Sequence, residues 1–578
     1  MSSSRTVHPR GGGCTIYGVA AAAALCTAYM LAGLGSYGLL DNNEGLYAAI
    51  ASAMAQGGGW IVPQVAGLPY PDKPPLLYWL VALSLRAFGN GEWAVRLVPA
   101  LAGLATVLVT GLATARAAGR DAGLRAAVVL GTSAGVVVIG RTLVFDMLFT
   151  LCLAVALLAW QAWWSGASRR WLRLGYAALA LAVLAKGLVA LVLAGLIVGA
   201  FALWERRRGE PLRLGVDAWG IALFAVIAVP WHAVAALEQP GFAWFYIVNE
   251  QLLRFLGLRQ PDDYYAGAWW YYLPRFWAMA FPWIVVAPLL VARQCSVATG
   301  GERSSLPRDE TFARFCVVWV LVVVGFYTLS RAKANYYVVQ ALPAAATLIA
   351  LRLPLLWERA NERRRGLAVV AGAATAIALA AAAWYLHRAE PGIGPVPDAW
   401  RPMQIACLVA AGLAVIATAG FATRSEALII GGFALMSAPL VAGAAWAIVH
   451  DQPGLSARDA VRYVDLHYPG RPVGLFQRFS DHSALAYYLG KRLVLYDHRS
   501  ADLAFARMQH ARSPWLRQAA DIEFRGGPPA IFVDVRDLSA ADPVLGSRYT
   551  ATRTFGTLVL YVQRPALQVA RLRAQGPP

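Results

Sequence analysis

The stretch Gly187–Trp204 reads GLVALVLAGLIVGAFALW and contains no charged residue. It is followed almost at once by the basic run Arg206–Arg208. An apolar run of this length beside a basic turn is typical of a helix that crosses a bilayer and ends at its cytoplasmic surface. Comparable runs recur from residue 15 to residue 449. The pattern therefore predicts a polytopic α-helical membrane protein.

The composition supports the same fold class. Of the 578 residues, 58% are hydrophobic and only 14% are charged, whereas a soluble domain is about a quarter charged. Too little polar surface remains to cover a water-soluble globule, and disorder and fibrous repeats are excluded. The net charge of +19 fits basic loops that lie against anionic membrane surfaces, so we expect no nucleic-acid partner. The six cysteines lie singly along the chain, which predicts neither a disulfide framework nor a cysteine metal site.

Thirteen apolar segments are expected to span the membrane. They lie near residues 15–35, 93–115, 122–140, 146–165, 172–186, 187–204, 214–236, 273–292, 313–330, 336–352, 366–387, 403–421 and 428–449. With the N-terminus in the cytoplasm, the Arg-rich turns fall on the cytoplasmic side, as the positive-inside rule requires. An odd number of spans then places the C-terminus on the outer side.

The chain divides into two predicted domains. Residues 1–450 form the transmembrane domain, and residues 36–92 within it form a first external loop with two interfacial helices, the second at Leu76–Phe88. Residues 451–578 alternate helix-like and strand-like patterns and predict a small external α/β domain. Its expected elements are helices at 455–466 and 483–489, strands at 472–477, 493–497 and 530–535, and a hairpin at 549–562 that turns at Gly556.

Polar side chains that the charge bias does not explain collect on the external side. Ionisable residues at a membrane boundary are costly unless they pair or face a cavity, so such a collection indicates a site. Cations there suit a phosphate-bearing lipid, and a carboxylate nearby suits a general base or a metal ligand. The residues are Asp41, Asn43, Glu44, Tyr70, Asp72, Lys73, Arg141, Asp146, Lys186, Glu250, Arg254, Lys333, Tyr336 and Tyr337.

Each of these features also has a purely structural explanation. Asp41 and Glu44 could form a variant of the capping box that starts a helix. Arg141 and Asp146 could pair to fix a turn, and Lys186 could extend to the outer headgroups. The functional interpretation is favoured because five separate segments converge on one face.

Three motifs resemble the protein O-mannosyltransferase superfamily. They are Asp41-Asn-Asn-Glu-Gly-Leu-Tyr47, Tyr70-Pro-Asp-Lys-Pro-Pro-Leu76 and Gly140-Arg-Thr-Leu-Val-Phe-Asp146. The segments Ala185–Gly187, Pro230–His232 and Ser330–Tyr337 match in order as well. The motifs look closest to the bacterial lipid A aminoarabinose transferases and their relatives that depend on undecaprenyl-phosphate sugars. The resemblance covers about residues 15–350 and implies a GT-C fold with thirteen membrane helices, interfacial helices in the first external loop and a periplasmic C-terminal domain.

The resemblance also implies an activity. An inner-membrane glycosyltransferase of this kind would transfer a sugar, with 4-amino-4-deoxy-L-arabinose as one alternative, from undecaprenyl phosphate to a periplasm-facing acceptor. Lipid A or another envelope glycolipid is the expected acceptor, and a single displacement predicts inversion at the anomeric carbon. A protein or another glycan as acceptor stays open, as does a flippase for the lipid-linked sugar. We expect the protein to act as a monomer.

The resemblance carries over to individual residues. Asp41 or Glu44 would orient or deprotonate the acceptor with support from Asp146, because the family's usual Asp is here Asn43, whose amide is no base. The resemblance assigns no definite cofactor and leaves open a divalent metal held by Asp72 and Glu250. The residues expected to bind the substrates are Asn43, Tyr47, Tyr70, Asp72, Lys73, Arg141, Lys186, Arg254, Lys333, Tyr336 and Tyr337.

Overall fold

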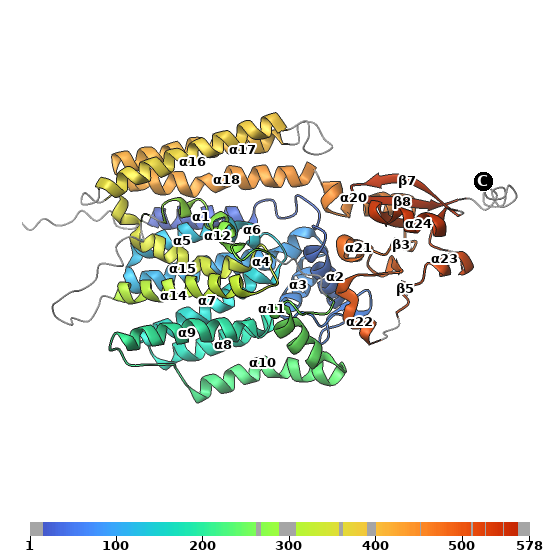
Figure 1. Ribbon diagram of the computed structural model, residues 1–578, viewed down its shortest axis with the longest axis horizontal. Coiled ribbons are helices and arrows are strands. Elements are labelled where there is room, and N and C mark those ends of the chain that lie inside the picture. The colour runs from blue at the N-terminus through green and yellow to red at the C-terminus, as the bar shows by residue number, and fades with distance from the viewer. Residues whose placement is uncertain are drawn as a thin grey trace, which may run out of the picture.

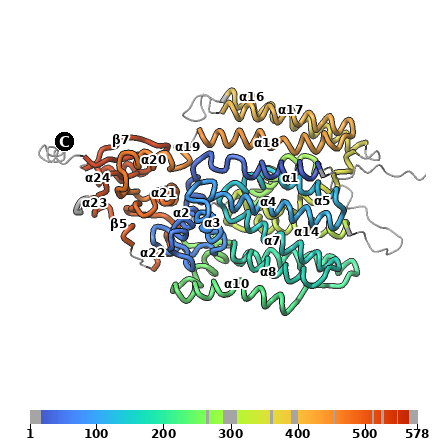
Figure 2. The backbone as a smooth tube through the Cα atoms, turned by 180° about the vertical axis from the view of Figure 1, so that it is seen from behind, coloured from blue at the N-terminus to red at the C-terminus, as the bar shows by residue number. Residues whose placement is uncertain are grey.

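Long helices lie side by side, and a smaller region of helices and strands lies at one end of them (Figures 1 and 2). The computed structural model describes residues 16–261, 267–287, 289, 308–357, 362–389, 400–450, 452–509, 513–525, 527–546 and 548–564. Helices α16–α18 run along one edge of the bundle, and α8–α10 run along the opposite edge (Figure 1).

The helices of the bundle follow the apolar runs of the sequence. Their bounds are α1 (Ile16–Leu31), α4 (Glu92–Ala118), α5 (Arg120–Gly131), α6 (Ala134–Gly140), α7 (Phe145–Trp164), α8 (Arg169–Lys186), α9 (Val189–Arg207), α10 (Ala218–Glu238), α11 (Arg254–Leu256), α12 (Tyr272–Ala280), α14 (Arg308–Leu329), α15 (Leu342–Arg352), α16 (Glu362–Ala389), α17 (Arg401–Thr423) and α18 (Glu426–His450). A π-helical segment, Trp244–Leu253, precedes α11, and a 3-10 turn, Tyr337–Ala341, leads into α15. Helix α7 is the most enclosed, with 89% of its apolar window buried.

Among the described residues, nine helices are long and apolar enough to cross a membrane. Counting α5 and α6, which meet at a 60° bend, as one broken span gives ten. The chain is therefore a multi-pass membrane protein, but the expected number of thirteen spans is not confirmed.

The three remaining expected spans are not among these ten, each for a different physical reason. Helix α1 has only 16 described residues, which at 1.5 Å per residue is shorter than a bilayer core. Helix α8 begins with Arg169, Arg170 and Arg173, so it is less apolar than the expected span 172–186. Helix α12 ends at Ala280, just before Pro282, so the expected span 273–292 is not one helix in its described part. Its residues 288 and 290–292, like residue 15 of the first span, lie outside the described residues.

Two helices fill the loop between α1 and α4. Helix α3 (Leu76–Phe88) has the expected bounds. Helix α2 (Asn43–Ala55) is buried on nearly all sides, because α3 covers one side and α21 (Ala484–Leu489) of the C-terminal region covers another. A two-stranded hairpin, β1 (Gln64–Val65) with β2 (Leu68–Pro69), joins the two helices.

A six-stranded mixed sheet organises the C-terminal region. Its strand order is β5-β4-β3-β6-β8-β7; the first four strands are parallel, and β8 pairs antiparallel with both β6 and β7. The strands are β3 (Val473–Phe476), β4 (Leu493–Tyr496), β5 (Leu516–Arg517), β6 (Ala530–Asp534), β7 (Tyr549–Phe555) and β8 (Leu558–Gln563). The helices are α19 (Gln452–Leu455), α20 (Arg458–His467), α21, α22 (Ala504–Met508), α23 (Ala520–Arg525) and α24 (Leu538–Leu545). The expected strands and hairpin are confirmed, whereas β5 was not expected.

The C-terminal region docks directly on α2. Gly45 is the closest point: a Cβ atom there would lie 2.5 Å from the amide nitrogen of Ala484, so only glycine permits this approach. The Ala484 amide donates to Asp41 Oδ1 at 3.0 Å, and the Ser483 hydroxyl donates to the Asn42 carbonyl oxygen. This contact brings the loops after β3 and β4 over the end of the helix bundle.

Candidate active site

A cavity of about 790 Å³ lies where the helix bundle meets the C-terminal region. Nine separate stretches of the sequence line it, including the start of α7, the end of α8 and the loop before α15. Its polar lining residues are Asn42, Asn43, Tyr47, Tyr70, Lys73, Asp146, Lys186, Arg254, Tyr271, Arg275, Lys333, Asn335, Tyr336, Tyr337, Ser480, Asp481 and Asp502. Most of the residues predicted to bind substrate therefore face one cavity.

An apolar groove of about 410 Å³ opens beside this cavity. Its lining includes the aliphatic and aromatic side chains Leu188, Val189, Val192, Ile247, Phe255 and Phe326. Four residues line both the groove and the cavity: Lys73, Lys186, Arg254 and Tyr337. Three of these residues, Lys73, Lys186 and Arg254, therefore place cations where the apolar groove meets the polar cavity, which we also call the chamber.

Glu250 holds two of these cations in place. Its Oε2 atom lies 3.3 Å from Lys73 Nζ and 3.3 Å from Arg254 Nη1. Arg259 binds Glu250 on the other side and Asp72 Oδ2 at 3.2 Å. Burial alone would raise the pKa of Glu250, but Lys73, Arg254 and Arg259 outweigh it and hold that pKa below its ordinary value. The cluster thus carries more positive than negative charge toward the cavity.

Asp146 and Lys186 form a buried ion pair. Gln340 Nε2 donates to the same Asp146 oxygen at 3.0 Å, and Lys186 Nζ lies 4.3 Å from the ring centroid of Tyr337. The first turn of α7 supplies the carboxylate, and the last turn of α8 supplies the ammonium. The tight packing of these two helices fixes both groups at the cavity wall.

Hydrogen bonds order the opposite wall. The Tyr47 hydroxyl donates to Asn43 Oδ1 at 3.0 Å, and Asn43 Nδ2 donates to the Tyr336 hydroxyl at 3.5 Å. Lys333 Nζ donates to the carbonyl oxygens of Tyr327 at 3.0 Å and Thr328 at 2.8 Å. The same Nζ lies 5.1 Å from the ring centroid of Tyr272.

Glu44 is not brought to the cavity. Arg96 Nε donates to its Oε1 at 2.9 Å and Arg96 Nη2 to its Oε2 at 2.6 Å. The amides of Leu143 and Leu40 donate to the same two oxygens. With its carboxylate enclosed in this way, Glu44 holds the first loop together and has no oxygen directed at a substrate.

Four other predicted site residues also lie outside the cavity lining, and one of them, Glu250, lines only the groove. Arg141 Nη1 donates to the Tyr29 carbonyl oxygen at 2.9 Å, behind the cavity wall. Asp72 faces Arg259. Asp41 faces the C-terminal region, where it accepts from Ala484. The alternative in which Arg141 pairs with Asp146 to fix a turn does not hold among the described residues, because Asp146 binds Lys186.

Asp72 and Glu250 do not fit a divalent cation. Arg259 bridges the two carboxylates, and Lys73 and Arg254 occupy the remaining oxygen of Glu250. A metal ion needs those oxygens free of cationic partners. Within the described ranges, no group of three His, Cys, Asp or Glu side chains is arranged to hold a metal ion.

Residues 72–233 match the family model of the dolichyl-phosphate-mannose-protein mannosyltransferases. The resemblance to this superfamily is confirmed. The matched segment includes Lys73, Asp146 and Lys186, which are three of the charged residues of the cavity wall.

Relatives from Pseudomonas share a similar stretch. The undecaprenyl phosphate-α-4-amino-4-deoxy-L-arabinose arabinosyl transferase of Pseudomonas paraeruginosa is 31% identical over 56% of this chain and 57% of its own length. Transferase 1 of that name from Pseudomonas fluorescens is 28% identical over 56% of this chain and 55% of its own length. The alignments thus span little more than half of each relative.

A solved structure matches over nearly the whole chain. The crystal structure of ArnT from Cupriavidus metallidurans bound to undecaprenyl phosphate covers 95% of this chain and 98% of its own, with a TM-score of 0.76 and 22% identity. The likeness shows that the two chains share a fold over nearly their whole length.

Several lining residues of the cavity had no signal in the sequence. Arg275 lies on the ring of Tyr271, 3.3 Å from its centroid, and donates to Asn335 Oδ1 at 2.9 Å. Asp481 and Asp502 come from the C-terminal region, whose role in the site the sequence did not suggest. Arg275 lies beside an aromatic run that resembles a membrane-interface belt, so only its position in space shows that it lines the cavity.

A histidine bridges the first loop and the C-terminal sheet. His482 Nε2 lies 2.7 Å from Asp534 Oδ2, and its Nδ1 lies 3.9 Å from Asp41 Oδ2. Burial alone would lower the pKa of His482, but the two carboxylates raise it above its ordinary value. The charged form is therefore favoured in the folded protein.

The His482 bridge predicts a pH-dependent stability. A raised folded pKa contributes stability that is complete below about pH 6.5, the unfolded value, and is lost as pH rises through the folded pKa. We expect the Tm of the wild type to exceed that of His482→Gln most at about pH 6, and the gap to shrink as pH rises above that value. Thermal unfolding of both proteins across this range checks it, and a gap that does not change with pH would contradict it.

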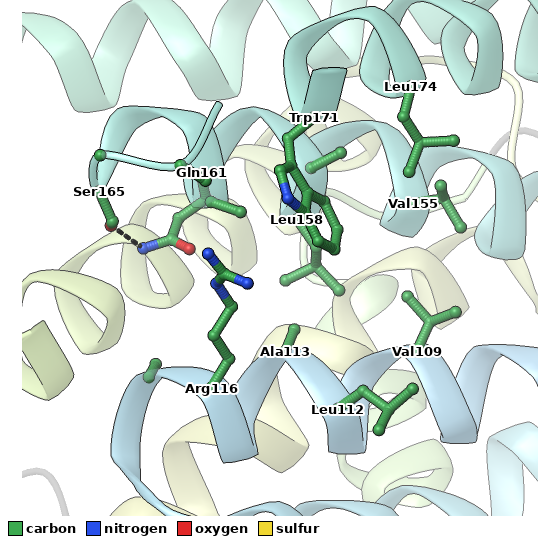
Figure 3. A pocket seen from close by; sticks show the side chains of 15 residues that line it. Val109, Leu112, Ala113, Arg116, Val155, Leu158, Gln161, Ser165, Trp171 and Leu174 are labelled. Atoms are coloured by element: carbon green, nitrogen blue, oxygen red, sulfur yellow. Dashed lines mark hydrogen bonds between the residues drawn. The ribbon is translucent and has the colours of Figure 1, made fainter. Parts of the chain in front are cut away.

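A separate cavity of about 410 Å³ lies between α4, α7 and α8, toward the other end of α7 (Figure 3). Arg116 lies over the ring of Trp171, 5.2 Å from its centroid, and Gln161 Nε2 donates to the Ser165 hydroxyl at 2.9 Å. Gln161 follows Asp146 by four turns of α7, or roughly 22 Å. No carboxylate is among the described residues that line this cavity, so it does not fit acid–base chemistry.

Proposed function

We propose that the chain is an inner-membrane glycosyltransferase that moves a sugar from undecaprenyl phosphate to an acceptor on the periplasmic side. The observation that carries the proposal is the position of Lys73, Lys186 and Arg254 between the apolar groove and the polar cavity. A polyprenyl chain fits the groove, its phosphate fits the three cations, and its sugar extends into the chamber. The names of the Pseudomonas relatives support this donor.

The cations would supply most of the catalysis. When the sugar leaves, negative charge grows on the departing phosphate, and fixed ammonium and guanidinium groups stabilise that charge without reorganising. Glu250 keeps two of the cations in position, and Asp146 keeps the third. Direct attack by an acceptor oxygen held across the chamber gives inversion at the anomeric carbon.

The chamber also suggests the kind of sugar. Asp502 and Asp481, which also pairs with Arg536, line it from the C-terminal region, and carboxylates of this kind bind a protonated amino group. This supports 4-amino-4-deoxy-L-arabinose as the donor sugar and lipid A, or another envelope glycolipid, as the acceptor. In this proposal residues 1–450 form the transmembrane domain and residues 451–578 form a periplasmic domain that closes the chamber.

Transfer in a purified system tests the proposal. The full chain in detergent is mixed with undecaprenyl-phosphate-linked aminoarabinose and lipid A, and mass spectrometry follows both lipids. We expect lipid A to gain the mass of one sugar while free undecaprenyl phosphate accumulates. Binding of the donor without any turnover would reject the enzyme and favour a lipid-linked sugar flippase.

A further inference from the structure

The C-terminal sheet contains a topological switch point. The chain runs from β3 to β4 and β5 on one side of β3, and then returns to place β6 on its other side. The loops that follow β3 and β6 therefore leave the sheet in opposite directions. In open α/β sheets, the crevice at the carboxyl ends of strands beside such a point is where ligands bind.

A pocket of about 380 Å³ lies at this place in the sheet. All of its lining residues come from the loops directly after β3, β4 and β6: Gln477, Arg478, Ser480, Asp481, Arg499, Ser500, Ala501 and Asp537. Gln477 and Asp497, the first residues after β3 and β4, both have positive φ angles, 60° and 44°. Non-glycine residues in this conformation are strained and often occur at binding sites.

Some polar groups of the pocket have no partner among the described residues. The Ser480 hydroxyl oxygen is buried without a hydrogen bond, and a buried polar atom in that state favours a ligand or water. The guanidinium of Arg499 forms no ion pair among the described residues, whereas Arg478 binds Asp537 at 2.8 Å and lies 3.6 Å from Asp481. The lining thus alternates hydrogen-bond donors and acceptors, and the guanidinium of Arg499 is its one cation without an ion pair among the described residues.

These groups match one class of ligand. Alternating carboxylates, amides and guanidinium groups pair with the hydroxyl groups of a sugar ring, which both donate and accept. Because Arg499 forms no ion pair among the described residues, its guanidinium suits one acidic substituent, such as a phosphate, on that sugar. The volume is within the usual range for small-ligand pockets.

The pocket adjoins the main cavity. Ser480, Asp481 and Ala501 line both spaces. A saccharide held at the carboxyl edge of the sheet would therefore extend into the chamber where the donor sugar is expected.

We propose that this switch-point pocket binds a phosphorylated saccharide unit of the acceptor, an inference that rests on the proposed glycosyltransfer. Arg499 binds the phosphate, and Ser480 and Gln477 bind ring hydroxyls. The C-terminal region would then select the acceptor, while the helix bundle holds the donor.

Binding measurements on the full chain test the pocket without any turnover. The probe is the deacylated, phosphorylated glucosamine disaccharide of lipid A, titrated into protein in detergent by calorimetry. We expect Arg499→Ala to weaken binding tenfold or more, since it removes a hydrogen bond to a charged group. Gln477→Ala should weaken it less, and the exposed Arg462→Ala on α20 should bind as the wild type does. The dephosphorylated disaccharide should bind the wild type about as weakly as the phosphorylated one binds Arg499→Ala.

The outcomes separate this inference from the proposed function. If the wild type transfers sugar to lipid A but Arg499→Ala has an unchanged affinity for the probe and an unchanged KM for lipid A, the pocket is not the acceptor site and the glycosyltransferase stands. The inference also fails if the wild type does not bind the probe, or binds it equally with and without its phosphates. If the probe binds as expected while the wild type transfers no sugar, the pocket stands and the proposed donor chemistry fails.

Discussion

Lys186→Met should lower kcat at least 100-fold with lipid A and the undecaprenyl-phosphate-linked aminoarabinose as substrates. Lys186 stands at the junction of groove and chamber, where the leaving phosphate gains charge. Removing one fixed group that stabilises transition-state charge costs about 10²–10³ in kcat. The donor KM should change much less, because the charge on the phosphate is greatest in the transition state. Steady-state release of undecaprenyl phosphate measures both constants.

The Asp146–Lys186 ion pair complicates this variant, because Lys186→Met leaves Asp146 buried without its cation. The double variant Asp146→Asn with Lys186→Met removes both charges and should restore most of the Tm without restoring turnover. Lys491→Met, in the 3-10 turn Gly490–Arg492 of the C-terminal region and outside the cavity lining, is the matched control and should keep both the Tm and the turnover of the wild type. Turnover that returns in the double variant would show that Lys186 acts only by balancing Asp146.

Local pattern was enough to predict much of the fold. Each matching span is a single apolar run, and α3 begins directly after Pro74 and Pro75 and ends before Gly89, so its bounds follow from neighbouring residues. The strands β3, β4 and β6 are short apolar runs between turn residues, and β7–β8 turns at Gly556. Helix α8 shows the limit of this approach. Because it contains three arginines, its place in the bundle depends on packing and not on hydropathy.

The site was predicted less completely, because its geometry depends on contacts between distant segments. The sequence alone could indicate Lys73, Asp146 and Lys186 as site residues, because a charged side chain at a membrane boundary is costly unless it pairs or faces a cavity. No local pattern indicated that Arg96 would enclose Glu44, or that Glu250 would bind Arg259 in place of a metal. Asp481 and Asp502 reach the cavity only because Gly45 allows α21 to dock on α2.

Glu44 offers a direct contrast between a catalytic and a structural carboxylate. We expect Glu44→Gln to destabilise the fold by about 3–5 kcal/mol, because it breaks a buried ion pair and leaves the guanidinium of Arg96 without its counter-charge. Arg96 also donates to the carbonyl oxygens of Leu34, Tyr37 and Gly38. Loss of Glu44 therefore loosens the whole segment that leads into α2. The expected result is a low yield of folded protein with a strongly lowered Tm.

The double variant Glu44→Met with Arg96→Met separates the two roles. Replacing both partners removes the unpaired charge, so the Tm should recover in part, although three carbonyl oxygens lose their donor. Turnover should recover to the same extent, since no oxygen of Glu44 faces the cavity. Thermal unfolding in detergent and the transfer assay measure the two quantities on the same samples. Glu44→Gln protein with a wild-type Tm and no turnover would instead make Glu44 the general base, because only its chemistry would then have been lost.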